Sequence, residues 1–318
     1  GASIGRILSG KAGAYNVAIV KTKPDPQLLT NRFLYHYLQS DYFQEYILNV
    51  GGRAAQAGFN KGDLERLEIP LPPLEEQKRI TAILDKADAI RRKRQQAIKL
   101  ADDFLRATFL DMFGDPVTNP KGWSIKNIEN ISIRVTKGES PNWQGFKYQD
   151  NGVCFVTSEN VLWGELDRKK RKNIPEQFHQ KLERSQLREN DLLINLVGAS
   201  VGRTCLVPSD ILPANINQAV SVTTLDNKQV IPFFVLQQIL TPQIQHKLLG
   251  NAVDFARANI SLTNIRELEI IVPPLNDQKK WTDIANNALS IQRTHNDINT
   301  DGSRLFNSLT QRAFRGEL

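Results

Sequence analysis

Two stretches of the chain carry apolar residues at a seven-residue spacing among charged and polar neighbours. These residues are Ile83, Ile90, Ala97 and Phe104 in the first stretch, and Ile284, Ile291, Ile298 and Leu305 in the second. Four such heptads predict long helices that pair through these positions as an antiparallel coiled coil. Each stretch follows a Pro-Pro pair, which cannot lie inside a helix and therefore marks the start of one. A solvated helical face without a partner is the alternative.

Further residues form a second apolar line or interrupt the predicted contact lines. A second line in the first helix consists of Ile80, Ala87, Ala101 and Thr108. The charged or small residues Arg94, His295 and Gly302 interrupt the contact lines. These three positions either loosen the pair or face another subunit.

The region between the two helices alternates short apolar runs with polar loops. The runs at 153–156, 191–197, 204–207 and 219–223 are rich in β-branched residues and predict strands. Residues 232–248 carry apolar positions at helical spacing, and residues 31–48 form an equivalent segment. The pattern predicts an α/β (α+β) fold in which β-rich domains alternate with long helices.

An internal repeat organises the chain. The sequence Gly-Ala-Ser-Ile-Gly-Arg at 1–6 recurs as Gly-Ala-Ser-Val-Gly-Arg at 198–203, an offset of 197. The sequence Leu-Glu-Ile at 67–69 recurs at 268–270, an offset of 201. Asn16 already matches Asn217 at this offset, which places a four-residue insertion or deletion between positions 6 and 16. A period near 200 predicts a duplicated module of globular domain plus helix. We expect four segments: 1–74, 75–114, 115–274 and 275–318, with the first domain lacking its N-terminal part.

Composition narrows the classes of function. The 318 residues include 41 Lys+Arg and 34 Asp+Glu, a net charge of +7, which permits a nucleic-acid or anionic-membrane partner. An ordinary basic surface is the alternative. Two cysteines exclude a disulfide scaffold and favour a reducing cytoplasm. No apolar run approaches the ~18 residues of a membrane span.

Polar loops of the 115–274 segment carry candidate DNA contacts. Five consecutive cations at 168–172 attract phosphates independently of sequence, with a solvated charged loop as the alternative. The expected phosphate contacts are Arg168, Lys169, Lys170, Arg171, Lys172 and Arg203. The residues expected near base edges are Lys137, Ser140, Trp143, Ser158, Asn160, Asn217 and Gln218. For the asparagines, capping of backbone groups in turns is an equal alternative.

Catalytic motifs are weak in this sequence. Ser3 and Ser200 fit the G-x-S-x-G pattern of hydrolases, but that pattern requires a helix after the serine, and a strand is expected at 204–207. The four histidines have no metal-ligand spacing, and no phosphate-binding P-loop motif occurs. We therefore expect no catalytic centre and no metal. Two alternatives stay open: a Mg²⁺-dependent nuclease using Asp167 and Lys169, and a purely structural coiled-coil adaptor.

The arrangement resembles the specificity (S) subunit of type I restriction-modification systems along the whole chain. The resemblance rests on the duplicated module with a long helix after each copy, and on local motifs. These motifs are Leu-Pro-Pro-Leu-Glu-Glu-Gln-Lys-Arg-Ile at 71–80, Val-Pro-Pro-Leu-Asn-Asp-Gln-Lys-Lys at 272–280, Lys-Gly-Trp at 121–123, the two Gly-Ala-Ser-x-Gly-Arg turns, and the terminal Gln-Arg-Ala-Phe-Arg-Gly-Glu-Leu at 311–318. The loop at 136–141 is similar to the family's Gly-x-Thr/Ser-Pro loop.

This resemblance implies a non-catalytic component of a prokaryotic defence complex. In that family, each target-recognition domain reads one half of a split sequence in double-stranded DNA. The paired helices measure the spacer and dock methyltransferase (M) subunits, which bind S-adenosylmethionine, and motor-nuclease (R) subunits join them. The implied S subunit is cytoplasmic and has no cofactor of its own.

The first domain departs from the family pattern. About 80 residues equivalent to the start of the second module are absent, including counterparts of the 137–143 and 168–172 loops. We therefore expect that the first domain does not read DNA by itself. Either the sequence is a fragment, or it is an N-terminally truncated S subunit that forms a self-dimer to recover two domains.

Overall fold

The computed structural model describes residues 4–10, 13–16, 19–51, 61–170, 172–250 and 259–318, and for residues 291–305 it describes the backbone alone. The chain forms two compact units. The first contains residues 1–103 together with 289–318, and the second contains residues 104–288. Two long helices, α4 (Leu74–Phe113) and α9 (Leu275–Arg315), contribute to both units. No helix in these described ranges is long and apolar enough to cross a membrane.

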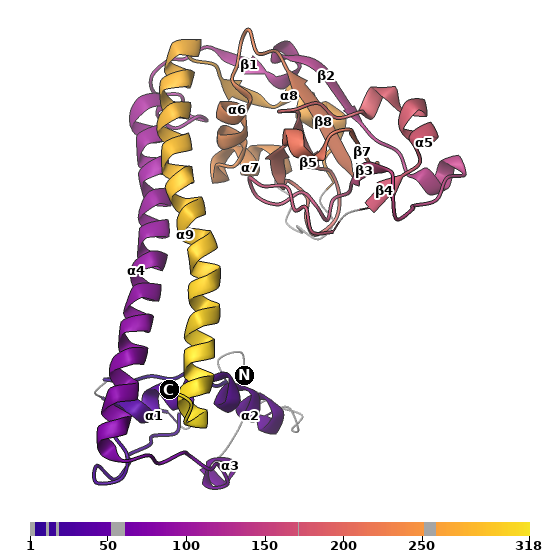
Figure 1. Cartoon of the computed structure of the whole chain (residues 1–318). Coiled ribbons are helices and arrows are strands. Elements are labelled where there is room, and N and C mark those ends of the chain that lie inside the picture. The colour runs from indigo at the N-terminus through magenta and orange to yellow at the C-terminus, as the bar shows by residue number, and fades with distance from the viewer. Residues whose placement is uncertain (1–3, 11–12, 17–18, 52–60, 171, 251–258) are drawn as a thin grey trace. The chain divides into compact units, whose positions relative to one another are not determined.

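The first unit is helical. Besides the outer parts of α4 and α9, it contains α1 (Asn31–Leu38), α2 (Asp41–Gly51) and α3 (Lys61–Glu65). Thr30 caps α1, because its side chain accepts a hydrogen bond from the backbone N–H of Phe33. Figure 1 shows α1 and α2 beside the start of α4 and the end of α9.

The described residues of the second unit form three sheets. The largest is antiparallel, with the order β2 (Ser132–Lys137), β8 (Val220–Leu225), β5 (Leu192–Asn195) and β6 (Thr204–Leu206). A mixed sheet places β3 (Val153–Val156) between the antiparallel β4 (Lys172–Ile174) and the parallel β7 (Ala214–Ile216). The third joins β1 (Ile125–Asn127) to β9 (Glu269–Ile271). The remaining helices are α5 (Glu176–Lys181), α6 (Pro232–Ile239), α7 (Pro242–Leu249) and α8 (Leu262–Glu267), with 3₁₀ turns at η1 (Ile128–Ile131), η2 (Pro141–Gln144), η3 (Glu183–Ser185) and η4 (Ser209–Ile211).

Successive side chains of β5 point to opposite faces of the sheet, and a separate apolar core covers each face. Leu192 and Ile194 face a core shared with α6, α7 and α8, whereas Leu193 faces a core shared with β3, β6 and β7. A strand buried on both faces has no polar alternation, which is why residues 192–194 form a continuous apolar run. The predicted strands at 153–156, 191–197, 204–207 and 219–223 are confirmed as β3, β5, β6 and β8.

The helical segment predicted at 232–248 is two helices. The break lies at Thr241, whose side chain accepts the N–H of Ile244 and caps α7, while Pro242 occupies the first turn. The predicted segment at 31–48 divides in the same way into α1 and α2. Apolar spacing persists across both breaks, so periodicity alone did not reveal them.

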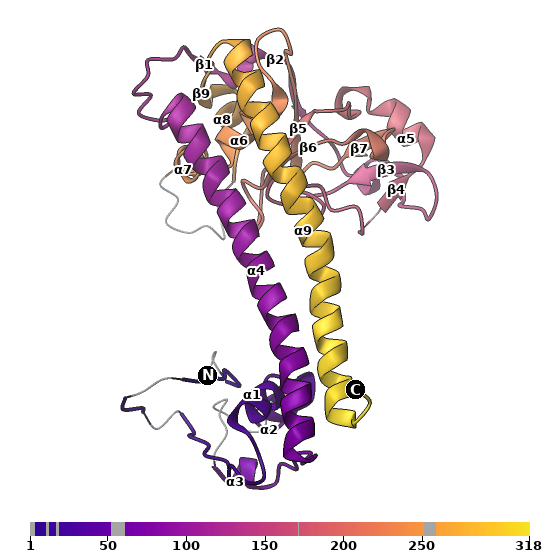
Figure 2. The same ribbon diagram turned by 60° about the vertical axis from the view of Figure 1, so that its left-hand side comes forward.

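The helices α4 and α9 pack against each other in both units. In the first unit, Ile80 and Leu84 of α4 share a buried cluster with Phe306 and Ala313 of α9. Both ribbon views show the start of α4 beside the end of α9 (Figures 1 and 2). In the second unit, Phe109 and Phe113 share a cluster with Trp281 and Ala285. The ring centroids of Phe109 and Trp281 are 5.3 Å apart. Since the beginning of each helix packs against the end of the other, they run antiparallel, as expected.

The contact line on α4 differs from the predicted one. Ile90 is 51% exposed, Phe104 is 52% exposed and Ile284 of α9 is 36% exposed, so the prediction that these residues pair the helices is wrong. Ile83 and Ala97 are half-buried. The side chains of Ile291, Ile298 and Leu305 lie outside the described residues. A seven-residue period was correct for α4, but its phase was not, because the buried line passes through Leu84 rather than Ile83.

Equivalent glutamines tie each repeat to its long helix. In the first repeat, the Gln77 side chain accepts the N–H of Thr30 (2.9 Å) and donates to the carbonyls of Leu28 (2.7 Å) and Pro72 (2.9 Å). Gln278 makes the same three bonds 201 positions later, to Ile231, Gln229 and Pro273. Both amides are fully buried. The duplication inferred from sequence is therefore a duplication of hydrogen-bond geometry.

A second pair of glutamines locates the insertion or deletion between the repeats. Gln44 donates to the carbonyls of Gly5 and Leu38, and Gln245 donates to those of Gly202 and Ile239. The glutamines are 201 positions apart, but the glycines are 197 apart. Gly5 and Gly202 both have positive φ, at 78° and 82°, which favours glycine there. The four-residue difference therefore lies after Gly5, in agreement with the sequence comparison, although Gly1–Ser3 lie outside the described residues.

Candidate nucleic-acid interface

Four of the six predicted phosphate contacts lie on the segment that leads into β4 or at its first residue: Arg168, Lys169, Lys170 and Lys172. Arg168 makes a two-point ion pair with Asp210 (2.8 and 3.0 Å), and this bond raises the pKa of the guanidinium. Lys172 lies 3.7 Å from the carboxylate of Glu159 and 5.8 Å from the ring centre of Tyr148. Lys169 and Lys170, between them, are exposed. Arg171 lies outside the described residues. The described cations thus differ in how many acidic groups already neutralise them.

Asn160 shapes this segment from within. Its side chain is buried; it accepts the N–H of Thr157 (2.9 Å) and donates to the carbonyls of Asp167 (3.1 Å) and Lys170 (2.9 Å). A buried amide with these bonds has no edge to offer to a base. The prediction that Asn160 lies near base edges is therefore wrong, and the amide holds the cation segment in shape instead.

The 137–144 loop presents an exposed indole. It follows β2, and Gly138 permits its entry, because a Cβ there would lie 1.7 Å from the carbonyl oxygen of Ile216. Pro141 begins the short turn η2, and Trp143 in that turn is 74% exposed. Lys137 is exposed and Ser140 is half-buried. The loop thus displays a large apolar ring and a cation together.

Two polar bonds join this loop to residues 181–184, and a third links two residues within the loop. Glu139 forms an ion pair with Arg184 of η3. The Gln144 side chain donates to the Glu139 carboxylate (2.7 Å) and accepts from Lys181 of α5 (2.8 Å). Loop and helix therefore hold each other through side chains on the surface.

The chain that follows the loop meets the strand at the end of the cation segment. The N–H of Gln149 donates to the carbonyl of Asn173 in β4 (3.1 Å). The Asn173 side chain donates back to the carbonyl of Asp150 (2.7 Å). Because Lys172 begins β4, these bonds join the chain after the aromatic loop to the end of the cation segment.

The glycine turn at 198–202 connects β5 to β6. Because a strand rather than a helix follows Ser200, the turn lacks the geometry of a hydrolase nucleophile, as expected. Asn195 donates to the Ser200 hydroxyl (3.1 Å) and to the carbonyl of Ser158 (2.9 Å). This amide places the half-buried Ser158 beside the turn. Arg203, also half-buried, directly follows the turn, and its carbonyl accepts the backbone N–H of Asn195 (2.9 Å).

The remaining predicted base contacts lie near the start of β8. The Asn217 side chain accepts the N–H of Ala219 (3.1 Å), a turn-capping bond that uses its oxygen. Gln218 is half-buried, and its side-chain oxygen has no hydrogen-bond partner among the described residues. The nearby Asn215 of β7 is buried and accepts a hydrogen bond from the Ser185 hydroxyl (2.7 Å). It is therefore structural.

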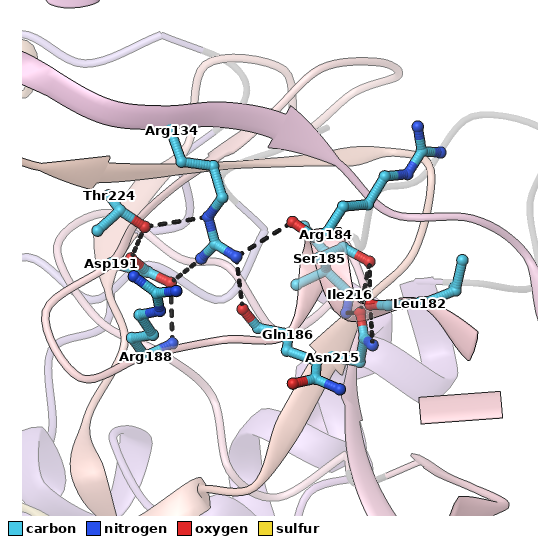
Figure 3. Close-up of polar contacts among 10 residues, drawn as sticks. All are labelled: Arg134, Leu182, Arg184, Ser185, Gln186, Arg188, Asp191, Asn215, Ile216 and Thr224. Atoms are coloured by element: carbon cyan, nitrogen blue, oxygen red, sulfur yellow. Dashed lines mark hydrogen bonds and ion pairs between the residues drawn. The ribbon is translucent and has the colours of Figure 1, made fainter. Parts of the chain in front are cut away.

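Sequence analysis did not single out a buried ion pair next to this region. Arg134 of β2 lies 2.8 Å from the carboxylate of Asp191, which precedes β5 (Figure 3). Burial raises the pKa of Asp191 and lowers the pKa of Arg134, whereas their mutual attraction opposes both shifts. One signal was present in the sequence, namely a carboxylate directly before the apolar run 192–194.

The alternative nuclease site has a simple local geometry. The Asp167 carboxylate accepts the backbone N–H of Lys169 (2.8 Å), which is a turn contact. In the described part of the chain, no group of three or more His, Cys, Asp or Glu side chains is placed to hold a metal ion.

Comparison with known proteins agrees with this architecture. The model of the family described as "Type I restriction modification DNA specificity domain" matches residues 1–100 and 120–300. The chain belongs to this family. As a member of the type I specificity family, it is a DNA-specificity component and not a catalytic subunit. The fold and the duplicated module are those expected from the resemblance noted in the sequence.

Relatives and solved structures span most of the chain. The type I restriction enzyme EcoBI specificity subunit of Escherichia coli is 24% identical and aligns with 95% of this chain and 69% of its own length. The type I restriction enzyme MjaVIII specificity subunit of Methanocaldococcus jannaschii is 21% identical, and the alignment covers 88% of this chain and 68% of that protein. The S subunit from M. genitalium superposes with a TM-score of 0.58 at 14% identity, covering 91% of this chain and 74% of that one. The HsdS subunit from Thermoanaerobacter tengcongensis superposes with a TM-score of 0.50 at 21% identity, covering 92% of this chain and 71% of that one.

Proposed function

We propose that this chain is the DNA sequence-recognition subunit of a type I restriction-modification complex. Its second unit reads one half of a split target in double-stranded DNA, and its paired helices hold methyltransferase and motor-nuclease subunits. S-adenosylmethionine binds to the methyltransferase subunit. The observation that carries the DNA contact is the exposure of Trp143, Lys169 and Lys170 on polar loops of one unit, in a chain of the specificity family.

Within this unit, the proposed roles divide by side-chain chemistry. Lys169, Lys170 and Arg203 contact phosphates, and Arg168 and Lys172 do so after leaving their carboxylate partners. Trp143 and Lys137 contact bases, as the residues that the loop displays most openly. Ser140, Ser158, Asn217 and Gln218 complete the proposed base-reading set.

The proposed division of labour follows the repeat. Residues 115–274 form a target-recognition domain, and residues 1–74 correspond to the C-terminal part of another one. Segments 75–114 and 275–318 are the helices that join them to the partner subunits. The equivalent bonds of Gln77 and Gln278 support this division, because each fastens a domain to its helix in the same way.

Selection from a pool of duplexes with a randomised centre tests the proposed function. The full chain is incubated with the pool at low salt, bound duplexes are amplified over several rounds, and the enriched motif is placed in a labelled duplex. Fluorescence anisotropy then compares this selected duplex with a shuffled one. We expect at least tenfold tighter binding to the selected duplex, since each lost base contact changes affinity by about 1–3 kcal/mol.

Two outcomes would contradict the proposed function. A pool that never converges on a motif, with and without added methyltransferase subunit, would favour a purely structural adaptor. Cleavage of the duplex by the chain in Mg²⁺, abolished by Asp167→Ala, would establish the nuclease alternative instead.

A further inference from the structure

Arg134 is bound to acceptors on three separate segments. Its Nε donates to the hydroxyl of Thr224 in β8 (3.1 Å), and one terminal nitrogen donates to Asp191 (2.8 Å). The other terminal nitrogen donates to the backbone carbonyls of Arg184 (3.1 Å) and Gln186 (3.0 Å). Figure 3 shows the guanidinium pointing from β2 into this ring of acceptors. The side chain thus ties the 184–186 backbone to the large sheet.

Asp191, the carboxylate partner of Arg134, is itself held by several hydrogen bonds, and we call the Arg134–Asp191 pair the clamp. Asp191 is 1% exposed and accepts from the Thr224 hydroxyl and from the backbone N–H of Arg188 (2.8 Å), as well as from Arg134. The Arg134 side chain is 18% exposed. Removing two charges from water is unfavourable, so a buried pair of this kind contributes little net stability relative to apolar packing. It does contribute a defined geometry, because the planar guanidinium accepts few arrangements of partners.

The clamped backbone reaches the candidate base-reading loop. This backbone, at residues 184–186, lies between Lys181 and Arg188 in the sequence. Side chains of this stretch contact two residues of the 137–144 loop. Arg184 pairs with Glu139, and Lys181 donates to Gln144, next to Trp143. At the other side, the hydroxyl of Ser185 donates to Asn215 of β7. The path from the sheet to the indole therefore consists of bonds between described residues: Arg134 to the 184–186 backbone, Arg184 to Glu139, and Glu139 to Gln144.

We propose that the Arg134–Asp191 pair is a positioning device for sequence discrimination, which fixes the Trp143 loop relative to the β2–β8–β5–β6 sheet without contacting DNA. The inference rests on the proposed function and adds to it a specificity-determining pair outside the contact surface. Loss of the clamp frees the loop to adopt several positions, so that base contacts weaken while phosphate contacts persist. Affinity for the selected duplex then falls towards the affinity for any duplex.

Arg134→Lys tests the device, because lysine keeps the charge near Asp191 but lacks the planar fork that serves the two carbonyls. Binding of the full-length variant to the selected and the shuffled duplex is measured by anisotropy, with folding checked by circular dichroism. We expect the ratio of the two dissociation constants to fall at least tenfold, with the shuffled duplex bound within about twofold of wild type. Arg266→Lys is the matched control, because Arg266 donates to the carbonyl of Val135 on the same strand (3.0 Å) and should leave the ratio unchanged.

A double-variant cycle distinguishes positioning from general destabilisation. Glu139→Gln removes the ion pair with Arg184 at the surface and should lower the ratio by itself. If Arg134 acts through this contact, the double variant discriminates no worse than Arg134→Lys alone. The Glu139→Gln arm also tests the path if Arg134→Lys fails to fold.

The inference is overturned if the two effects add, if Glu139→Gln leaves the ratio unchanged, or if Arg134→Lys weakens both duplexes equally. These results are separable from a failure of the proposed function, in which the wild-type chain itself shows no preference between the duplexes.

Discussion

Replacing Lys169 and Lys170 together with glutamine should flatten the salt dependence of DNA binding without changing sequence preference. Both side chains are exposed on the segment before β4, and no ion pair involving them is found within the described residues. Their neighbours differ, because Arg168 is bound at two points by Asp210 and Lys172 lies near Glu159. The two lysines can therefore bind phosphates without breaking an ion pair within the described part of the chain.

The magnitude follows from counterion release. Each phosphate contact contributes about 0.9 to the slope of log affinity against log salt, so the double variant should lower the slope by about 1.8. Between about 50 mM and about 200 mM salt, wild type should then lose about twelvefold more affinity than the variant. Arg168→Gln should lower the slope by less than the value of about 0.9 expected for one phosphate contact. The reason is that the bond between Arg168 and Asp210 must be broken before Arg168 can bind a phosphate.

Anisotropy titrations over a salt series, on the selected and the shuffled duplex, provide the measurement. Lys279→Gln with Lys280→Gln on α9 is the matched control, because it removes the same charge from exposed positions elsewhere in the unit. The reasoning is refuted if the slope is unchanged by the test variant, or if the control lowers it by the same amount.

Three further predictions follow from particular contacts. Asp210→Asn should strengthen binding to the selected and the shuffled duplex alike, because it removes the carboxylate that pairs with Arg168; unchanged affinity for both would contradict this. Gln278→Leu should lower the free energy of unfolding by about 3 kcal/mol in urea titrations, since three backbone groups lose their partner; Gln77→Leu is the equivalent change in the other repeat, and a loss below about 1 kcal/mol in both would refute the argument. Burial raises the pKa of Cys205 to about 12, so in a Cys154→Ser chain at pH 8 this thiol should react with a disulfide reagent only after unfolding; rapid reaction of the native chain would show that the thiol is accessible.

Two kinds of residue were hard to judge from the sequence. Asn160 and Asn217 have the same donors and acceptors whether they meet a base or a backbone group, and only the positions of Thr157, Asp167 and Ala219 around them decide which. Ile83 and Leu84 are adjacent, and both continue a seven-residue line. Only the packing shows which one is buried: Leu84 lies in the cluster with Ile80 and Phe306, whereas Ile83 is half-buried.

The sequence by itself determined the duplicated module, the two long helices, the main strands and the family, because each depends on patterns that repeat along the chain. The offsets of 197 and 201 even located the insertion that the Gln44 and Gln245 bonds later confirmed. Only the tertiary structure decided the phase of the helix contact, the burial of Asn160 and the Arg134–Asp191 clamp. These depend on residues distant in sequence that meet in space: Arg134 and Asp191 are 57 positions apart, and no local pattern connects them.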